Sequence, residues 1–214
     1  MNDLRVSRVH FPVTALGPGT RLTIWTQGCP LACRGCMSRD TWDPSGGAAI
    51  AIKDLETGWL RAAARGATGL TVSGGEPLTQ PAALAVLLAR VRAVSPAADI
   101  LLYTGYEPAE LNGVQEEAAA LADVLIVGRY EASLPTRLIW RGSANQRMIL
   151  QTPLGRARYA AHEHEEVQRT PMQAVVKESG EILLIGVPPP GSLGKIEREL
   201  RSRGIRLNNA SQRS

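Results

Sequence analysis

The sequence has 214 residues, of which 44% are hydrophobic and 21% charged, with a formal net charge of +4. This composition predicts one globular domain or one domain with a small extension, and it excludes a disordered or fibrous protein. The longest apolar runs, such as 82–89, are far shorter than the roughly 20 residues of a membrane-spanning helix, which excludes a transmembrane protein. The polar start of the chain lacks the apolar core of a signal peptide, so we expect a cytoplasmic protein with reduced thiols.

The positive charge does not predict a surface for nucleic acid. The one dense basic stretch lies near the end of the chain and comprises Arg198, Arg201, Arg203 and Arg206. Proteins that bind the phosphate backbone usually carry basic residues clustered over a whole face. Nucleic acid is therefore not an expected partner.

Strands and helices alternate along the first part of the chain. Apolar and polar residues alternate over 22–27, which predicts a half-buried strand. Further strands are predicted at 70–73, 100–103 and 124–127, and helices at 53–65, from Pro81 onward and at 108–121. The helix from Pro81 has leucine or valine at positions i, i+3, i+4 and i+7, the pattern of a helix packed on one face. This alternation indicates right-handed βαβ units on a parallel sheet.

Glycines follow each of the predicted strands. The four segments are Gly28-Cys29, Gly74-Gly75, Thr104-Gly105 and Gly128-Arg129. Ligands in such folds bind at the carboxyl ends of the parallel strands. We therefore expect these segments to lie around one site.

The pattern changes at about residue 158. The apolar segments 173–176 and 182–185 flank Glu178-Ser179-Gly180, which predicts a hairpin, and Ser192 is expected to cap a last helix that ends near Ser202. We divide the chain into a main domain, 1–157, and a C-terminal extension, 158–214. His162 and His164 could bind a metal, but the glutamates around them favour a solvated linker.

The three cysteines are close together in the sequence, as Cys29, Cys33 and Cys36 in the pattern CxxxCxxC. A structural zinc ion takes four ligands, and no histidine is near these cysteines. A disulfide would leave one thiol over in a reducing compartment. A 4Fe–4S cluster bound by three thiolates leaves one iron open to a substrate, and this is the expected group. Three unrelated thiols, or zinc completed by a remote residue, are the alternatives.

This pattern resembles the radical S-adenosylmethionine superfamily. The segment 71–78, TVSGGEPL, is similar to the GGEP motif of that superfamily and stands at the expected strand end. In the family this turn meets the methionine amino group of the cofactor, and glycines let backbone carbonyls approach an ammonium closely. The resemblance thus implies S-adenosylmethionine as a cofactor, bound at Gly74, Gly75 and Glu76.

Within the superfamily the chain is most similar to the small glycyl-radical activating enzymes, especially the activases of anaerobic ribonucleotide reductase. The similarity spans roughly 12–150 and is carried by 25–29, 33–36, 41–43, 103–106 and 141–147. It implies backbone contacts of Gly35 and Met37 with adenine. Thr104, Asn145 and Arg147 are further candidates for the cofactor site, with a polar turn as the alternative. Val127, where such activases often have Asp, and the long tail after Arg147 depart from the pattern.

The resemblance implies an α/β fold, namely a partial (β/α) barrel of the radical S-adenosylmethionine type with a C-terminal β-hairpin and helix. The implied reaction is reductive cleavage of S-adenosylmethionine to a 5′-deoxyadenosyl radical, which takes hydrogen from a glycine of a partner protein. Flavodoxin or ferredoxin is the expected electron donor. The alternatives are a stand-alone radical enzyme acting on a peptide or small molecule, and a non-catalytic iron–sulfur or zinc protein.

Overall fold

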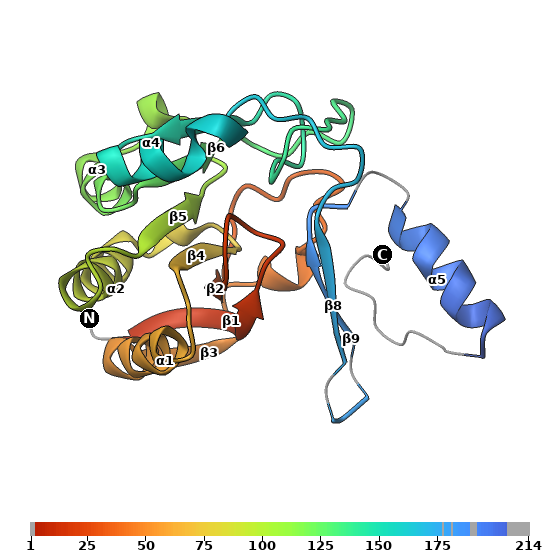
Figure 1. Ribbon diagram of the computed structural model, residues 1–214, viewed down its shortest axis with the longest axis horizontal. Coiled ribbons are helices and arrows are strands. Elements are labelled where there is room, and N and C mark those ends of the chain that lie inside the picture. The colour runs from red at the N-terminus through yellow and green to blue at the C-terminus, as the bar shows by residue number, and fades with distance from the viewer. Residues whose placement is uncertain (1–2, 177, 181, 189–191, 205–214) are drawn as a thin grey trace.

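The computed structural model describes residues 3–176, 178–180, 182–188 and 192–204. These residues form a seven-stranded sheet with helices and a separate two-stranded hairpin (Figure 1). Arg206 of the basic stretch and the side chain of Ser192, expected as a helix cap, lie outside the described part. No helix in the described part is long and apolar enough to cross a membrane.

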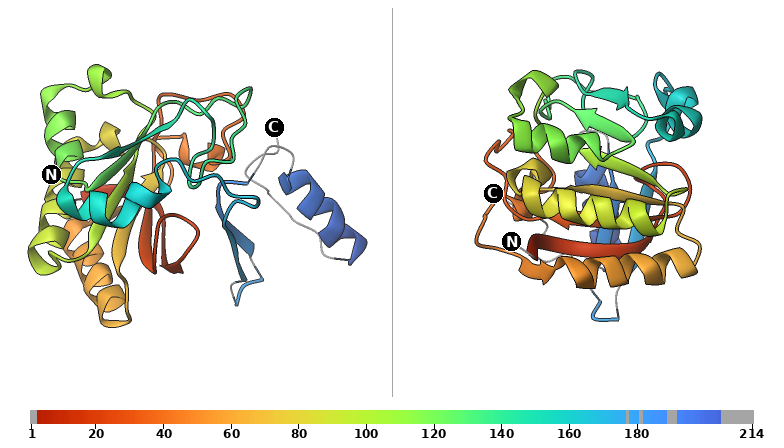
Figure 2. Two further views of the ribbon diagram at one scale, coloured as in Figure 1. Left: turned by 45° about the horizontal axis from the view of Figure 1, so that its top comes forward. Right: turned by 90° about the vertical axis from the view of Figure 1, so that its left-hand side faces the viewer.

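Four parallel strands form the centre of the large sheet. They are β2 (Arg21–Thr26), β4 (Gly69–Gly74), β5 (Asp99–Tyr103) and β6 (Val124–Val127). The helices between them are α1 (Ile52–Ala64), α2 (Pro81–Val94) and α3 (Gly113–Ala120). All three helices cover one face of the sheet, as Figure 2 shows. The predicted βαβ arrangement is confirmed for this central part.

Antiparallel strands extend both edges of the sheet. β1 (Asp3–Val13) pairs with β2, β3 (Ala48–Ala51) pairs with β1, and β7 (Arg147–Leu150) pairs with β6. The strand order is β3-β1-β2-β4-β5-β6-β7, and the sheet does not close on itself. The expected partial barrel is therefore confirmed, but the sheet is mixed where the sequence pattern predicts a parallel one.

The helix predicted for 108–121 is too long. Residues Pro108–Glu110 form a separate 3-10 turn, and α3 begins only at Gly113. The side chain of Asn112 accepts a hydrogen bond from Gln115 N, and the side chain of Gln115 accepts one from Asn112 N, both at 3.1 Å. This capping box satisfies amides at the helix start and so sets where α3 begins.

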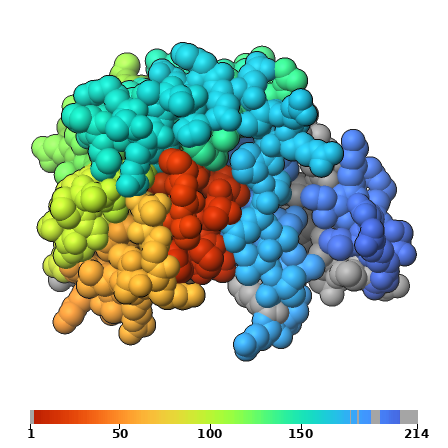
Figure 3. All heavy atoms as spheres, in the orientation of Figure 1, coloured from red at the N-terminus to blue at the C-terminus, as the bar shows by residue number. Residues whose placement is uncertain are grey.

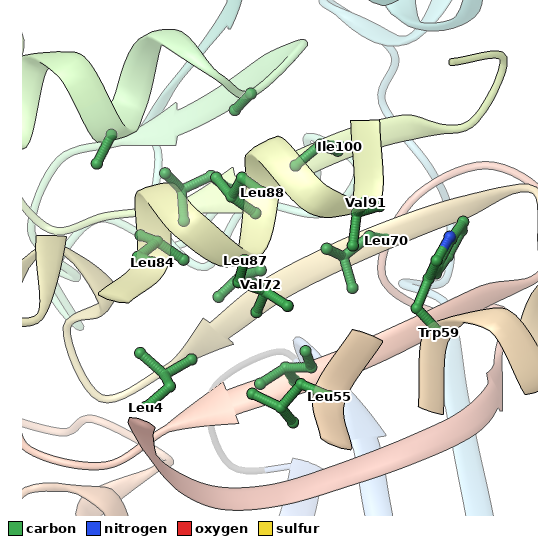
Figure 4. Close-up of a cluster of buried hydrophobic side chains, with 14 of the residues drawn as sticks. Leu4, Leu55, Trp59, Leu70, Val72, Leu84, Leu87, Leu88, Val91 and Ile100 are labelled. Carbon is green, nitrogen blue, oxygen red and sulfur yellow. The ribbon is translucent and has the colours of Figure 1, made fainter. Parts of the chain in front are cut away.

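The main hydrophobic core lies between the sheet and the three helices (Figure 4). The strands contribute alternate residues, because successive strand residues point to opposite faces. Leu22, Ile24, Leu70, Val72, Ile100 and Leu102 face this core from the strands, and Leu55, Trp59, Leu84, Leu87, Leu88 and Val91 face it from α1 and α2. The periodic residues of the helix from Pro81 are thus confirmed as buried.

Two smaller clusters cover the other face of the sheet. One packs Leu101 and Ile126 under Trp140 and Tyr159, the last residue of α4 (Pro153–Tyr159). The other joins Trp25 of β2 to the hairpin of β8 (Met172–Val176) and β9 (Ile182–Gly186). With α5 (Ser192–Ser202), this hairpin confirms the expected C-terminal elements. The domain boundary proposed between residues 157 and 158 falls within α4, and it stays a prediction.

A buried ion pair joins the first residues of β2 and β5. Arg21 Nη2 lies 2.7 Å from Asp99 Oδ2, and both side chains are fully buried. Arg21 Nε donates to Thr71 Oγ1 at 2.6 Å, while Asp99 accepts hydrogen bonds from Arg158 and Tyr159. Burial alone raises the pKa of Asp99, but Arg21 and the hydrogen-bond donors together hold it below its usual value. The pair therefore fixes the amino ends of the central strands.

Arg21→Met should lower the free energy of unfolding by about 3 kcal/mol, because the buried Asp99 then keeps only the partly exposed Arg158 as a cationic partner. The matched control is Arg90→Met in the exposed pair with Glu56, which should cost less than about 1 kcal/mol. Urea unfolding at pH 7 measures both values. Since the folded pKa of Asp99 is lowered, its contribution should be present above the unfolded pKa of about 3.9 and lost as the pH falls through the folded value. Equal losses of unfolding free energy in the two variants would show that burial does not increase the contribution of the pair to stability.

Candidate cofactor site

A cavity of about 880 Å³ lies at the carboxyl ends of the central strands. Cys29, Cys33 and Cys36 line it, together with residues 74–76 at the end of β4 and Thr104 and Gly105 after β5. Gly128, which follows β6, also lines the cavity. The structure thus brings together the strand-end segments that the sequence predicts around one site.

The cysteine loop, which runs from Gly28 to Trp42 and carries the three thiols, is closed by backbone hydrogen bonds. At the end of β2, Gly28 turns the chain with a φ of +98°, a conformation that favours glycine. Gly28 N donates to Thr41 O at 2.8 Å, and Cys29 N donates to Trp42 O at 3.0 Å. These bonds bring the far end of the loop back to β2. The thiols are therefore positioned by a closed loop and not by a regular helix or strand.

Gln27 reinforces this closure from inside the loop. Its side chain is buried, and Gln27 Nε2 donates to Asp40 O at 3.1 Å and to Asp43 O at 2.8 Å. An apolar residue at this position would leave two carbonyl groups without their donor. Gln27 is a positioning residue that the sequence indicates only through its place in the TQGC segment.

The three thiols are free and half-buried. Burial raises the pKa of Cys29 and Cys33, although nearby backbone amides oppose the shift at both thiols and Arg129 opposes it at Cys33. Thiolates therefore form here when a metal replaces the proton. Among the described residues, no three Cys, His, Asp or Glu side chains converge so as to hold one metal ion. Thiolates are the usual ligands of iron–sulfur clusters, and three free thiols that line one cavity are a donor set of this kind.

The two glycines at the end of β4 are required by the packing of the protein itself. A Cβ atom at Gly74 would lie 2.5 Å from Thr26 N, and one at Gly75 would lie 2.3 Å from Gly28 O. Two hydrogen bonds hold the turn in place, from Gly75 N to Thr26 O at 2.9 Å and from Glu76 N to Gly28 O at 2.8 Å. The turn is thus fixed against the start of the cysteine loop. Close approach to an ammonium group, the reason drawn from the sequence, stays a prediction.

Glu76 links two strand ends through a buried carboxylate. It accepts hydrogen bonds from Thr104 Oγ1 at 2.9 Å, Leu78 N at 3.0 Å and Gly105 N at 2.7 Å. Burial raises the pKa of Glu76 to about 7, although the hydrogen bonds act in the opposite direction. Glu76 and Thr104 therefore shape the cavity by holding the turns after β4 and β5 together.

Gly35 and Met37 take different positions in the cysteine loop. Met37 lines the cavity. Gly35 has a φ of +81°, and a Cβ atom there would lie 3.1 Å from Ala132 Cβ, so this glycine lets the segment after β6 pack on the loop. Contact of either residue with adenine stays a prediction.

Asn145 and Arg147 are not among the described residues that line the cavity. Asn145 Nδ2 donates to Arg129 O at 2.8 Å, and Arg147 forms an ion pair with Glu107. Gln146 between them does line the cavity, and its side chain donates to Gly128 O at 3.0 Å. The polar segment is thus at the site, but a direct role of Asn145 or Arg147 stays a prediction.

The inner wall of the cavity includes three residues that lie within the motif segments but are not predicted as site residues. Trp25 of β2, Ser73 of β4 and Tyr103 of β5 all line it. They alternate with strand residues that face the helices, so strand periodicity could have identified them as one face. Tyr103 is held in place by its hydroxyl, which donates to Trp140 O at 3.0 Å.

A family model described as "4Fe-4S single cluster domain" matches residues 15–149. The anaerobic ribonucleoside-triphosphate reductase-activating protein of Enterobacteria phage T4 is 36% identical over 138 residues, which are 64% of this chain and 87% of that protein. The protein of the same name from Escherichia coli K12 is 36% identical over 143 residues, 64% of this chain and 93% of that protein. The crystal structure of QueE from Escherichia coli aligns with a TM-score of 0.43 and 16% identity over 58% of this chain and 71% of that chain.

The match to the family model ends before α4, the hairpin and α5, so these elements lie outside the shared domain. Within that domain lie all three cysteines and the turn after β4. The resemblance drawn from these motifs is confirmed. The chain therefore belongs to the 4Fe-4S single-cluster family of radical S-adenosylmethionine activating enzymes, together with the anaerobic ribonucleoside-triphosphate reductase-activating proteins.

Proposed function

We propose that this protein cleaves S-adenosylmethionine reductively and uses the 5′-deoxyadenosyl radical to take a hydrogen atom from a backbone glycine of a partner protein. The observation that carries the proposal is the presence of three free thiols and the fixed turn 74–76 in one cavity. Cys29, Cys33 and Cys36 would hold a 4Fe–4S cluster, which when bound would supply the electron for the cleavage and a site for S-adenosylmethionine.

The electron and atom balance of the reaction is simple. One electron enters from an external carrier, for which we propose flavodoxin or ferredoxin in the cytoplasm. The bond between sulfur and the 5′ carbon breaks, which releases methionine and the 5′-deoxyadenosyl radical. Transfer of the glycine α-hydrogen then yields 5′-deoxyadenosine and a glycyl radical on the partner.

The residues of the chain contribute position and shielding. Because two hydrogen bonds join the turn 74–76 to Thr26 and Gly28, a ligand on this turn is held at a fixed place relative to the cysteine loop. Trp25 and Tyr103 give the inner wall a largely apolar surface that limits water near a radical.

The partner class follows from the relatives, whose names describe activation of an anaerobic ribonucleoside-triphosphate reductase. We propose a glycyl-radical protein of this kind as the substrate. A stand-alone enzyme that modifies a peptide or small molecule is the second candidate. It is favoured by the hairpin, which lines the cavity although it lies outside the family domain.

Cys29→Ala, Cys33→Ala and Cys36→Ala should each abolish the cluster, because the sequence contains no fourth cysteine. The wild-type protein reconstituted without oxygen should hold about four irons and four sulfides per chain. Iron, sulfide and near-visible absorbance measure the outcome. Stoichiometric zinc in the wild-type protein, with no uptake of iron, would contradict the proposed cluster.

Gly75→Ala should lower both iron content and binding of S-adenosylmethionine, because the added methyl group meets Gly28 O and displaces the cysteine loop. Gly58→Ala in α1 is the matched control, since a Cβ atom there meets nothing within 4 Å. Iron analysis and calorimetry compare the two variants with the wild type. If Gly75→Ala binds iron and cofactor normally, the turn and the loop are not coupled.

With dithionite as reductant, the cluster-loaded protein should slowly form 5′-deoxyadenosine and methionine without any substrate, and the correct partner should accelerate this. Deuterium at the α-carbon of the partner glycine should appear in 5′-deoxyadenosine, and a stable organic radical should appear on the partner. Deuterium arriving from a free peptide or small molecule instead would favour the second candidate. Absence of cleavage by cluster-loaded protein would refute both enzymatic functions.

A further inference from the structure

Strand β9 lies along the cavity that contains the cysteines. All residues from 182 to 188 line this cavity, although successive strand residues point to opposite faces. Of the five residues of β8, only Met172 is among the lining residues of the described part. The cavity therefore lies beside the edge of β9 that faces away from β8.

This edge of β9 has unused backbone groups. In the described residues β9 pairs with β8 alone, in a two-stranded sheet. In an antiparallel pair, every second residue of a strand directs its N–H and C=O groups away from the partner strand. No backbone hydrogen bond joins this edge to another described segment. Within the described part of the chain it is a free strand edge, the kind of surface that pairs with another extended chain.

The hairpin is held firmly against the main domain. Gln173 of β8 makes two hydrogen bonds to the end of β1, with Gln173 Oε1 accepting from Thr14 N at 3.0 Å and Gln173 Nε2 donating to Pro12 O at 2.8 Å. Leu183 and Ile185 of β9 are buried in the cluster around Trp25. Figure 3 shows the hairpin packed beside the N-terminal segment. The free edge is therefore held in place before any ligand arrives, which reduces the entropic cost of pairing.

We propose that an extended peptide segment of the substrate pairs with the free edge of β9 as a third strand. The inference rests on the proposed function and adds the way in which the polypeptide is held. The cavity extends from Ser179 and Gly180 at the hairpin turn to the cysteines. A strand of five residues spans roughly 17 Å, so pairing along β9 directs the bound chain toward the site of hydrogen transfer.

The apolar side chains along β9 suit an extended peptide. Ile182, Leu184 and Val187 line the cavity along β9, and Leu16, from the segment after β1, lines the same cavity. Backbone pairing recognises an extended chain of almost any sequence, while side-chain pockets select alternate residues. A glycine in such a strand exposes its α-carbon without a side chain.

The first test uses a capped synthetic peptide of about nine residues, alternating Thr and Val with a central Gly, and two versions N-methylated at complementary alternate positions. Hydrogen–deuterium exchange of the cluster-loaded protein is measured with millimolar peptide. The parent peptide and one methylated version should slow exchange of the alternate β9 amides that point away from β8, and the other version should not. The β9 amides bonded to β8 are the internal reference, since they are protected with or without peptide. Equal effects of both methylated peptides, no added protection of the outward amides, or outward amides already protected in the free protein would each overturn the proposal.

The second test places a charge on the hairpin. Leu184→Lys should weaken peptide-induced protection of β9 about tenfold or more, because lysine on an edge strand opposes strand addition. The matched control is Ala174→Lys, at the cross-strand partner of Leu184 on β8, away from the cavity. Leu184→Thr should retain protection and shows that the hairpin tolerates substitution there. Equal loss in Leu184→Lys and Ala174→Lys would overturn the proposal.

Failure of this inference and failure of the proposed function are separate outcomes. Cleavage of S-adenosylmethionine by the wild-type protein without any peptide tests the proposed function alone. Protection of β9 by peptide requires no cleavage and tests the docking edge alone.

Discussion

The contact between the turn after β4 and the end of β2 determines where the site lies. With Cβ positions only 2.3 Å from Gly28 O and 2.5 Å from Thr26 N, glycine at 75 and 74 is required for the two chain segments to meet. This contact places residues 74–76 beside Cys29, while Glu76 extends the connection to the turn after β5. Three strand ends are thus joined into one rigid edge, on which the cysteine loop rests.

The open sheet explains why a cavity exists beside this edge. Helices α1, α2 and α3 cover one face with a single core, but the other face is covered by two separate clusters. At the amino ends of the strands, Arg21 and Asp99 fill the interior with a satisfied ionic network. At the carboxyl ends no such filling is present in the described part, and the space is bounded by Trp25, Tyr103 and the hairpin. The same sheet is therefore closed at one end and open to ligands at the other.

The C-terminal hairpin gives this member of the family its own cavity wall. The family domain ends at residue 149, yet residues 182–188 line the cavity with the cysteines. Its attachment depends on one amide side chain, Gln173, and on the packing of Leu183 and Ile185. A short addition to a shared domain can thus change which substrates reach the site while the chemistry of the cysteine loop is retained.

The sequence predicts the central strands, the helix from Pro81 and the hairpin, because their apolar residues repeat with the period of the element. It does not predict β1, where Leu4, Arg5 and Val6 alternate but the period is lost at Arg8, at the irregular pairing with β2. Leu4 and Val6 are nevertheless buried against the core. The start of α3 is also missed, because the capping box at Asn112 competes with the longer helical pattern. Edge strands and helix starts depend on contacts that periodicity does not describe.

The candidate site, like the fold, is predicted from the sequence only in part. The spacing of Cys29, Cys33 and Cys36 and the Gly74-Gly75 pair are local patterns, so the sequence alone predicts the three cysteines as cluster ligands and determines the strand ends at which these motifs stand. Only the tertiary structure decides that Gly75 packs on Gly28, that Glu76 is saturated by Thr104 and Gly105, and that Gln146 lines the cavity where Asn145 and Arg147 do not. The physical reason is that these roles depend on which distant segments meet, and close backbone approach and burial arise only once the sheet is assembled.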